Sequence, residues 1–160
     1  MANEVILFQD ANFHGPHKHV FDNEPNLNAP DDHGFDNKVS SIAVIDGNWR
    51  FFKDANFQNP YSVVLGPGLY DFVGKFKITN DDMSSLTAVA DSPTITGEPL
   101  NAHAILFEHG QFHGDHRHVF TAEPNLPDND FNDETSSIVV KQGNWSFFRD
   151  SGFHTDYGTV

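Results

Sequence analysis

The sequence contains a long internal repeat, and no other feature restricts the fold as strongly. Residues 4–28 read EVILFQDANFHGPHKHVFDNEPNLN, and residues 103–127 read HAILFEHGQFHGDHRHVFTAEPNLP. After a short deletion the match resumes, with DGNWRFFKDANFQNPYSVV at 46–64 and QGNWSFFRDSGFHTDYGTV at 142–160. Because a unit of roughly ninety residues occurs twice in the chain, the sequence predicts two similar domains rather than one.

A shorter repeat lies inside each long one. The segment FQDANFHG, which begins at Phe8, recurs in related form at Phe52, Phe107 and Phe148. Where the chain continues far enough, each copy is followed by a polar motif and then by an apolar run: SSIAVI, SSLTAV or SSIVVK. These runs alternate or are rich in β-branched residues, which is typical of half-buried strands. The sequence therefore predicts aromatic hairpins joined to strands, with few helices.

The polar motif has three copies, DNKVSS at 36–41, NDDMSS at 80–85 and NDETSS at 132–137. Each copy places two Asx side chains before two hydroxyls. Carboxylates, carboxamides, hydroxyls and backbone carbonyls are the oxygen ligands that Ca²⁺ takes in flexible geometry. The alternative is that Asx and Ser residues form ordinary turns between strands. Because the motif recurs at the same place after each hairpin, we favour ion binding.

Paired aromatic hairpins that each lead to a strand starting with SS resemble the βγ-crystallin family, and the motif resembles that of its microbial calcium-binding type. The resemblance implies an all-β fold, a Greek-key β-sandwich in which each domain combines two Greek keys. We expect a complete domain over 1–90, with keys at 1–46 and 47–90, and a linker over 91–101. The second domain, over 102–160, is expected to lack the end of its last Greek key.

The same resemblance implies that each ion takes ligands from both keys of a domain, including the backbone carbonyl that follows the first hairpin aromatic. The expected Ca²⁺ ligands of the first domain are Gln9, Asp36, Asn37, Lys38, Ser40, Lys53, Asn80, Asp81, Asp82 and Ser84. Those of the second domain, which lacks a fourth motif, are Glu108, Asn132, Asp133, Glu134 and Ser136. The second serine of each motif is interpreted as structural, because small hydroxyls bond backbone groups in turns; these are Ser41, Ser85 and Ser137.

A second group of candidate ligands is histidine. The segment HGPHKH contains His14, His17 and His19, and HGDHRH contains His113, His116 and His118. Residues two apart on a strand share a face, so each segment could present imidazoles to zinc, nickel or copper. The alternative is a polar strand face that was copied by duplication. The sequence identifies no third ligand for either group.

Charge and composition exclude several functional classes. With 23 acidic and 9 basic residues the net charge is −14, which disfavours nucleic acid and anionic membranes as partners and favours cations. The absence of cysteine excludes disulfides and thiolate sites. No nucleophile elbow, ordered catalytic triad or phosphate-binding loop is present, so we do not expect an enzyme. Trp49 and Trp145 are interpreted as core residues.

The leading hypothesis is therefore a calcium-binding βγ-crystallin protein that uses the ion for stabilisation, buffering or assembly. One alternative is a structural or stress protein of the same fold without ion binding, and another is a histidine-based transition-metal binder. An incomplete second domain has an unpaired sheet edge, which allows self-association or indicates a fragment of a longer protein. The chain is expected to be soluble; its location stays open, and it would be extracellular if a signal has been removed from the start of the sequence.

Overall fold

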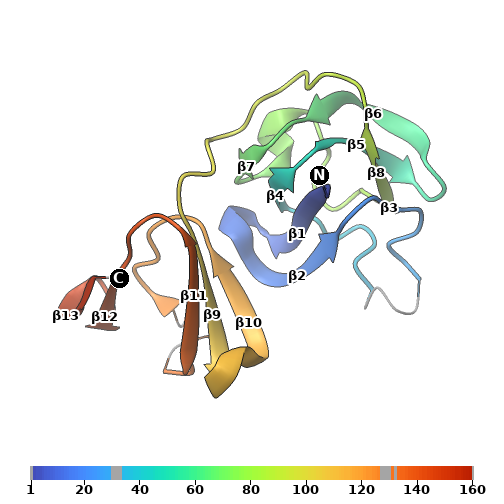
Figure 1. Cartoon of the computed structure of the whole chain (residues 1–160). Coiled ribbons are helices and arrows are strands. Elements are labelled where there is room, and N and C mark those ends of the chain that lie inside the picture. The colour runs from blue at the N-terminus through green and yellow to red at the C-terminus, as the bar shows by residue number, and fades with distance from the viewer. Residues whose placement is uncertain (1, 30–33, 127–130, 132, 160) are drawn as a thin grey trace. The chain divides into compact units, whose positions relative to one another are not determined.

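The computed structural model describes residues 2–29, 34–126, 131 and 133–159, and the chain divides into two compact units, Met1–Leu100 and Asn101–Val160 (Figure 1). In the described part of the chain, regular structure consists of β-strands and short 3-10 turns. No helix in that part is long and apolar enough to cross a bilayer. The chain is therefore all-β, as the sequence predicts.

The first unit contains two four-stranded antiparallel sheets. One sheet has the order β2-β1-β4-β7, formed by His14–Val20, Glu4–Asp10, Ser41–Asp46 and Gly68–Tyr70. The other has the order β3-β8-β5-β6, formed by Asn23–Glu24, Ser85–Val89, Asn48–Asp54 and Gln58–Leu65. Strand β7 comes from the second half of the unit but pairs with β4, and β3 comes from the first half but pairs with β8. This exchange confirms the Greek-key sandwich.

The core of the first unit lies between these two sheets. Val5 and Leu7 of β1 point into it, and Trp49 and Phe51 of β5 meet them from the other sheet, all at 0% exposure. The two-residue period of a strand explains why every second residue is apolar on this side. Burying each such side chain stabilises the fold by roughly 1.5–3 kcal/mol relative to leaving it exposed.

The hairpin turns repeat one backbone geometry in both halves of each unit. Gly15 and Gly114 have φ values of 77° and 82°, in the left-handed region that glycine tolerates well. Asn59 and Thr155 occupy the matching positions at φ 54° and 61°. Their side chains bond the aspartate at the start of the turn, Asp54 and Asp150 respectively. The turn is therefore the same without glycine, at some conformational cost.

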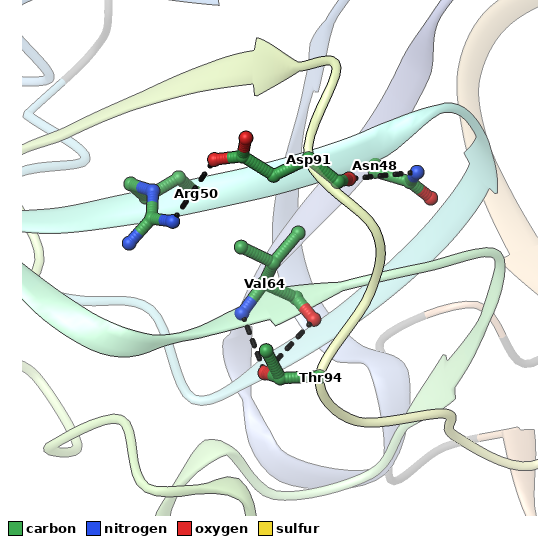
Figure 2. Close-up of polar contacts among 5 residues, drawn as sticks. All are labelled: Asn48, Arg50, Val64, Asp91 and Thr94. Atoms are coloured by element: carbon green, nitrogen blue, oxygen red, sulfur yellow. Dashed lines mark hydrogen bonds and ion pairs between the residues drawn. The ribbon is translucent and has the colours of Figure 1, made fainter.

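The linker is expected over 91–101, and residues 91–100 of it run along the first unit (Figure 2). Asp91 accepts hydrogen bonds from Asn48 Nδ2 at its carbonyl, 3.1 Å away, and from Arg50 at its carboxylate, 3.2 Å away. The Val64 amide donates to Thr94 Oγ1 at 2.9 Å, and the Thr94 amide donates to the Val64 carbonyl at 2.8 Å. The first compact unit thus extends to Leu100.

The second unit has fewer strands. Its three-stranded sheet has the order β10-β9-β11, formed by His113–Val119, His103–His109 and Ser137–Gln142. A separate hairpin pairs β12 with β13, which span Ser146–Asp150 and His154–Thr159. Within 101–126, 131 and 133–159 there is no counterpart of β7 or β8. Residues 122–123, which match β3, form no strand there, because the strand that β3 pairs with has no counterpart.

Candidate metal sites

The last serine of each polar motif fastens the preceding hairpin. Ser41 Oγ donates to the Asp10 carbonyl at 2.6 Å and accepts from the Phe13 amide at 2.9 Å. The same pair of bonds is made by Ser85 with Asp54 and Phe57 and by Ser137 with His109 and Phe112. This agrees with the structural role that the sequence predicts for these serines. The motif is therefore held next to its hairpin in both units.

The first serine of each motif is held through its backbone. The amides of Ser40, Ser84 and Ser136 donate to the carbonyls of the first hairpin aromatic at 2.9, 3.0 and 2.8 Å; these aromatics are Phe8, Phe52 and Phe107. The next residue along each hairpin is one of the predicted carbonyl ligands, namely Gln9, Lys53 or Glu108. Each predicted carbonyl ligand is therefore the next residue in sequence after the aromatic whose carbonyl bonds the motif.

In the first unit the two motifs lie against each other. The Asn37 amide donates to the Met83 carbonyl at 3.0 Å, and the Asp81 amide donates to the Val39 carbonyl at 3.3 Å. Ser40 Oγ donates to Asp81 Oδ1 at 3.3 Å. Asn37 and Asp81 share the same left-handed φ of 55°. Each loop therefore bonds the other, and in both directions.

Two side-chain oxygens in these loops lack a hydrogen-bond partner although they are buried. They are Asp36 Oδ1 and Asn80 Oδ1, which occupy the first position of each motif. The remaining side-chain atoms are engaged locally, with Asn37 Nδ2 bonded to Asp36 at 3.1 Å and Asn80 Nδ2 to Asp81 at 2.8 Å. A buried oxygen without a partner costs about 1–3 kcal/mol. A hard cation would satisfy both, so the residues present fit calcium.

Asp82 is directed elsewhere. Its carboxylate accepts a hydrogen bond from the Tyr61 hydroxyl at 2.7 Å and lies 4.0 Å from Lys53 Nζ. Burial raises the pKa of Tyr61, and the hydrogen bond from its hydroxyl to Asp82 raises it further. The carboxylate of Asp82 therefore bonds within its own key, to residues of β5 and β6. One carboxylate oxygen of Asp82 is thereby engaged, and its backbone carbonyl stays a predicted ligand, like that of the exposed Lys38.

Among the described residues of the second unit, its motif has no second motif beside it. Asn132 lies outside the described residues, while Asp133 has φ 59°, close to the value at Asn37. Ser136 and Glu134 are exposed, whereas Ser40 and Ser84 are buried at 7% and 9% exposure. The contacts between motif and hairpin are therefore formed in this unit, and the described residues include no facing motif from another key.

The histidines form a pair in each unit. His17 and His19 lie on one face of β2 with ring centroids 5.2 Å apart, and His116 and His118 lie likewise on β10, 5.1 Å apart. Within each pair the ligand nitrogens are within 4.8 Å of one another. His14 and His113 begin the same strands.

Each pair has a neighbour on the adjacent strand that sequence reasoning missed. His19 Nδ1 is 3.0 Å from Glu4 Oε1, and His118 Nδ1 is 2.8 Å from His103 Nε2. Glu4 and His103 occupy matching positions of the long repeat. The strand register could have identified them, because β1 and β2 pair so that Ile6 is opposite His19, two residues from Glu4.

Three solved structures that the chain resembles each match a little over half of it. A βγ-crystallin from an archaeon is 30% identical, with a TM-score of 0.49 over 56% of this chain and 100% of that one. A βγ-crystallin from Ciona intestinalis is 34% identical, with a TM-score of 0.49 over 54% of this chain and 99% of that one. A transition-metal-ion-binding βγ-crystallin from Methanosaeta thermophila is 34% identical, with a TM-score of 0.48 over 53% and 99%.

At the sequence level, the epidermal differentiation-specific protein of Cynops pyrrhogaster is 27% identical over 144 residues. The match covers 90% of this chain and 38% of that protein, so the chain spans well under half of this relative's length. The family model described as Beta/Gamma crystallin matches residues 4–89 and 103–157, which include nearly all of both copies of the long repeat. The chain therefore belongs to the βγ-crystallin family.

Proposed function

We propose that the protein binds calcium and that its first unit holds two ions between the two polar motifs. The observation that carries the proposal is the pair of cross-bonded loops with two buried oxygens, Asp36 Oδ1 and Asn80 Oδ1, that have no hydrogen-bond partner. The net charge of −14 favours a cation over any anionic partner. We propose no catalytic role and neither a nucleic-acid nor a membrane partner, since the family is in general structural.

Each ion would draw ligands from both motifs and from one hairpin. The proposed ligands are the carbonyls of Gln9, Lys38, Lys53 and Asp82 and side-chain oxygens of Asp36, Asn37, Ser40, Asn80, Asp81 and Ser84. Glu108, Asn132, Asp133, Glu134 and Ser136 would form the corresponding half-site of the second unit. Because a half-site supplies too few oxygens for the six to eight that calcium takes, the first unit is proposed to bind more tightly.

Bound calcium would connect loops that are far apart in sequence. Such an ion binds the folded state and not the unfolded chain, so it stabilises the fold by about 2.7 kcal/mol at a free concentration one hundred times its Kd. The sites contain few carboxylates, which is typical of weaker calcium binding. Weak binding together with stabilisation of the fold is what we expect of an ion that stabilises or assembles the protein, or of an ion that the protein buffers.

Isothermal titration with calcium tests the proposal. Ser40→Arg and Ser84→Arg each place a long cation where a hydroxyl ligand is proposed, so both should abolish heat from the first unit. Ser136→Arg is the matched control, since it makes the same change in the isolated motif and should leave that heat in place. Unchanged calcium binding in both first-unit variants would rule out the proposed ligands.

A structural or stress protein without ion binding is the alternative within the same family. It predicts no heat on calcium addition and no rise in Tm. The wild-type titration and a thermal melt with and without calcium separate the two, because a calcium-dependent Tm is expected only if the folded state binds the ion.

A second candidate function is transition-metal binding at the histidine pairs. The observation that favours it is the close approach of imidazoles within each unit, with Glu4 beside His19 and His103 beside His118. Zinc or nickel titration tests it: His17→Ala and His116→Ala should remove binding, whereas Ser40→Arg should not. If Ser40→Arg removes zinc binding as well, the metal is held by the polar motifs instead.

A further inference from the structure

Backbone bonds between the two polar motifs of the first unit define two pairs of side chains. The Asn37 amide donates at 3.0 Å to the carbonyl of the residue before Ser84. The Asp81 amide donates at 3.3 Å to the carbonyl of the residue before Ser40. The second position of each motif is thus placed beside the first serine of the other motif. Each ion of the proposed function takes ligands from both motifs, so each pair is the centre of one ion position.

The two pairs differ in charge. Asp81 offers a carboxylate to its ion position, whereas Asn37 offers a neutral carboxamide. Ser40 Oγ donates to Asp81 Oδ1 at 3.3 Å, and no hydrogen bond joins the side chains of Ser84 and Asn37 in the part of the chain that the structure describes. Both serines are buried, so water screens the charge beside them only weakly.

The two hairpins do not offset this difference. The Ser40 amide bonds the carbonyl of the residue before Gln9, and the Ser84 amide bonds the carbonyl of the residue before Lys53. The Asp81 position is therefore next to a neutral hairpin residue, and the Asn37 position is next to a cationic one. The Lys53 ammonium lies 4.0 Å from the carboxylate of Asp82, which compensates part of its charge. The carboxylate at position 81 remains the main difference between the two ion positions.

A second carboxylate, that of Asp36, lies in the motif that contains Asn37. Its Oδ2 accepts a hydrogen bond from Asn37 Nδ2 at 3.1 Å, and its buried Oδ1 has no hydrogen-bond partner. In the other motif the order is reversed, because Asn80 Nδ2 donates to Asp81 Oδ2 at 2.8 Å. The charge of one motif is therefore placed beside the facing serine, and the charge of the other is one position away from it.

We propose that the first unit binds its two calcium ions in a fixed order, first at Ser40 and Asp81 and then at Ser84 and Asn37. This order rests on the proposed calcium function and is determined by the carboxylate of Asp81. The charge of the ligands sets calcium affinity, and a carboxylate attracts the ion more strongly than a carboxamide in the same place. The dissociation constants of the two steps should differ by at least about tenfold. At intermediate calcium concentrations the unit then holds one ion.

Calorimetric titration of the full chain with calcium tests the order. The wild type should show two separate steps. Asp81→Asn should weaken the first step by at least about tenfold, so that the two steps merge. Asp36→Asn removes an equal charge one position away and should weaken the second step instead. Two steps of equal affinity in the wild type, or a first step weakened equally by both variants, would overturn the proposal.

Amide resonances identify the position that each step fills. Both motifs contribute to each ion and should respond in both steps, whereas each hairpin contributes to one ion only. The amides of Gln9 and Asp10 should therefore move in the first step, and those of Lys53 and Asp54 in the second. Simultaneous movement of the two hairpins in the wild type would contradict the proposal.

A charge exchange between the motifs completes the test. The double variant Asn37→Asp with Asp81→Asn keeps the net charge and nearly the same side-chain volumes, and it should make the second hairpin respond before the first. An unchanged order in this variant would show that Asp81 does not determine it and would overturn the proposal. Absence of any calcium response in the wild type would contradict the calcium function itself, so the two failures are distinguishable.

Discussion

The two units carry the same repeat, yet they bury it to different extents. Trp49 and Phe51 are fully buried in the first unit, while Trp145 and Phe147 are only partly buried in the second. The hairpins, in contrast, are alike: Ser41 and Ser137 hold theirs at 2.6 and 2.7 Å from the hairpin carbonyl. Hairpin structure is thus encoded within each key, whereas the core and the proposed ion site need two keys.

The polar motifs differ between the units for the same reason. Asn37 and Asp81 each receive a backbone contact from the facing motif, and Ser40 is buried by it. Asp133 adopts the same left-handed backbone in a unit whose described residues include no facing motif, and Ser136 stays exposed. The loop conformation is therefore local, and the calcium-binding arrangement proposed for it depends on pairing.

The largest difference is expected in the core. Phe51→Ala should lower the free energy of unfolding of the first unit by roughly 3–5 kcal/mol, because it leaves a cavity among fully buried side chains. Phe147→Ala should cost the second unit less than about 2 kcal/mol, since that ring is already partly solvated. Hydrogen exchange as a function of denaturant measures each unit separately. An equal loss of unfolding free energy in the two variants would mean that the core of the second unit is closed in solution.

A smaller difference is expected at the serine anchors. Ser41→Ala should destabilise the first unit by about 2 kcal/mol, because it leaves the Phe13 amide without its acceptor in a buried site. Ser137→Ala should cost the second unit less than about 1 kcal/mol, since water can replace the bonds at this exposed anchor. The same exchange experiment gives both values. A larger loss at Ser137 would contradict the solvated description of the second unit.

The smallest effect is expected at the turns where glycine is absent. Thr155→Gly should stabilise the second unit by up to about 1 kcal/mol, because a β-branched residue is strained at φ 61°. Asn59→Gly should change the first unit by only a few tenths of a kcal/mol, since Asn tolerates this region. Thermal melts of the two variants give the comparison. Destabilisation by Thr155→Gly would show that the bond to Asp150 outweighs the strain.

Because of the repeat, much of the fold could be predicted from the sequence. Strands after SS and hairpins at paired aromatics follow from local periodicity, and the Greek-key architecture follows from the family resemblance they carry. Contacts between residues that are distant in sequence could not be predicted in this way. Asp82 bonding Tyr61 and Glu4 meeting His19 depend on strand register, which the residue pattern alone does not give. The sequence predicts a linker at Asp91 and Thr94, because their partners on β5 and β6 are distant in sequence and the contacts could not be foreseen.

A residue-resolved calcium titration of the full chain tests the central claim most directly. Amide resonances of 36–41 and 80–85 should shift together at low calcium, because the two motifs are proposed to share ions. Resonances of 133–137 should respond only at much higher concentrations. Independent titration of the two first-unit motifs, or a response of the second unit at equal concentration, would contradict the claim that the ion requires a pair of keys.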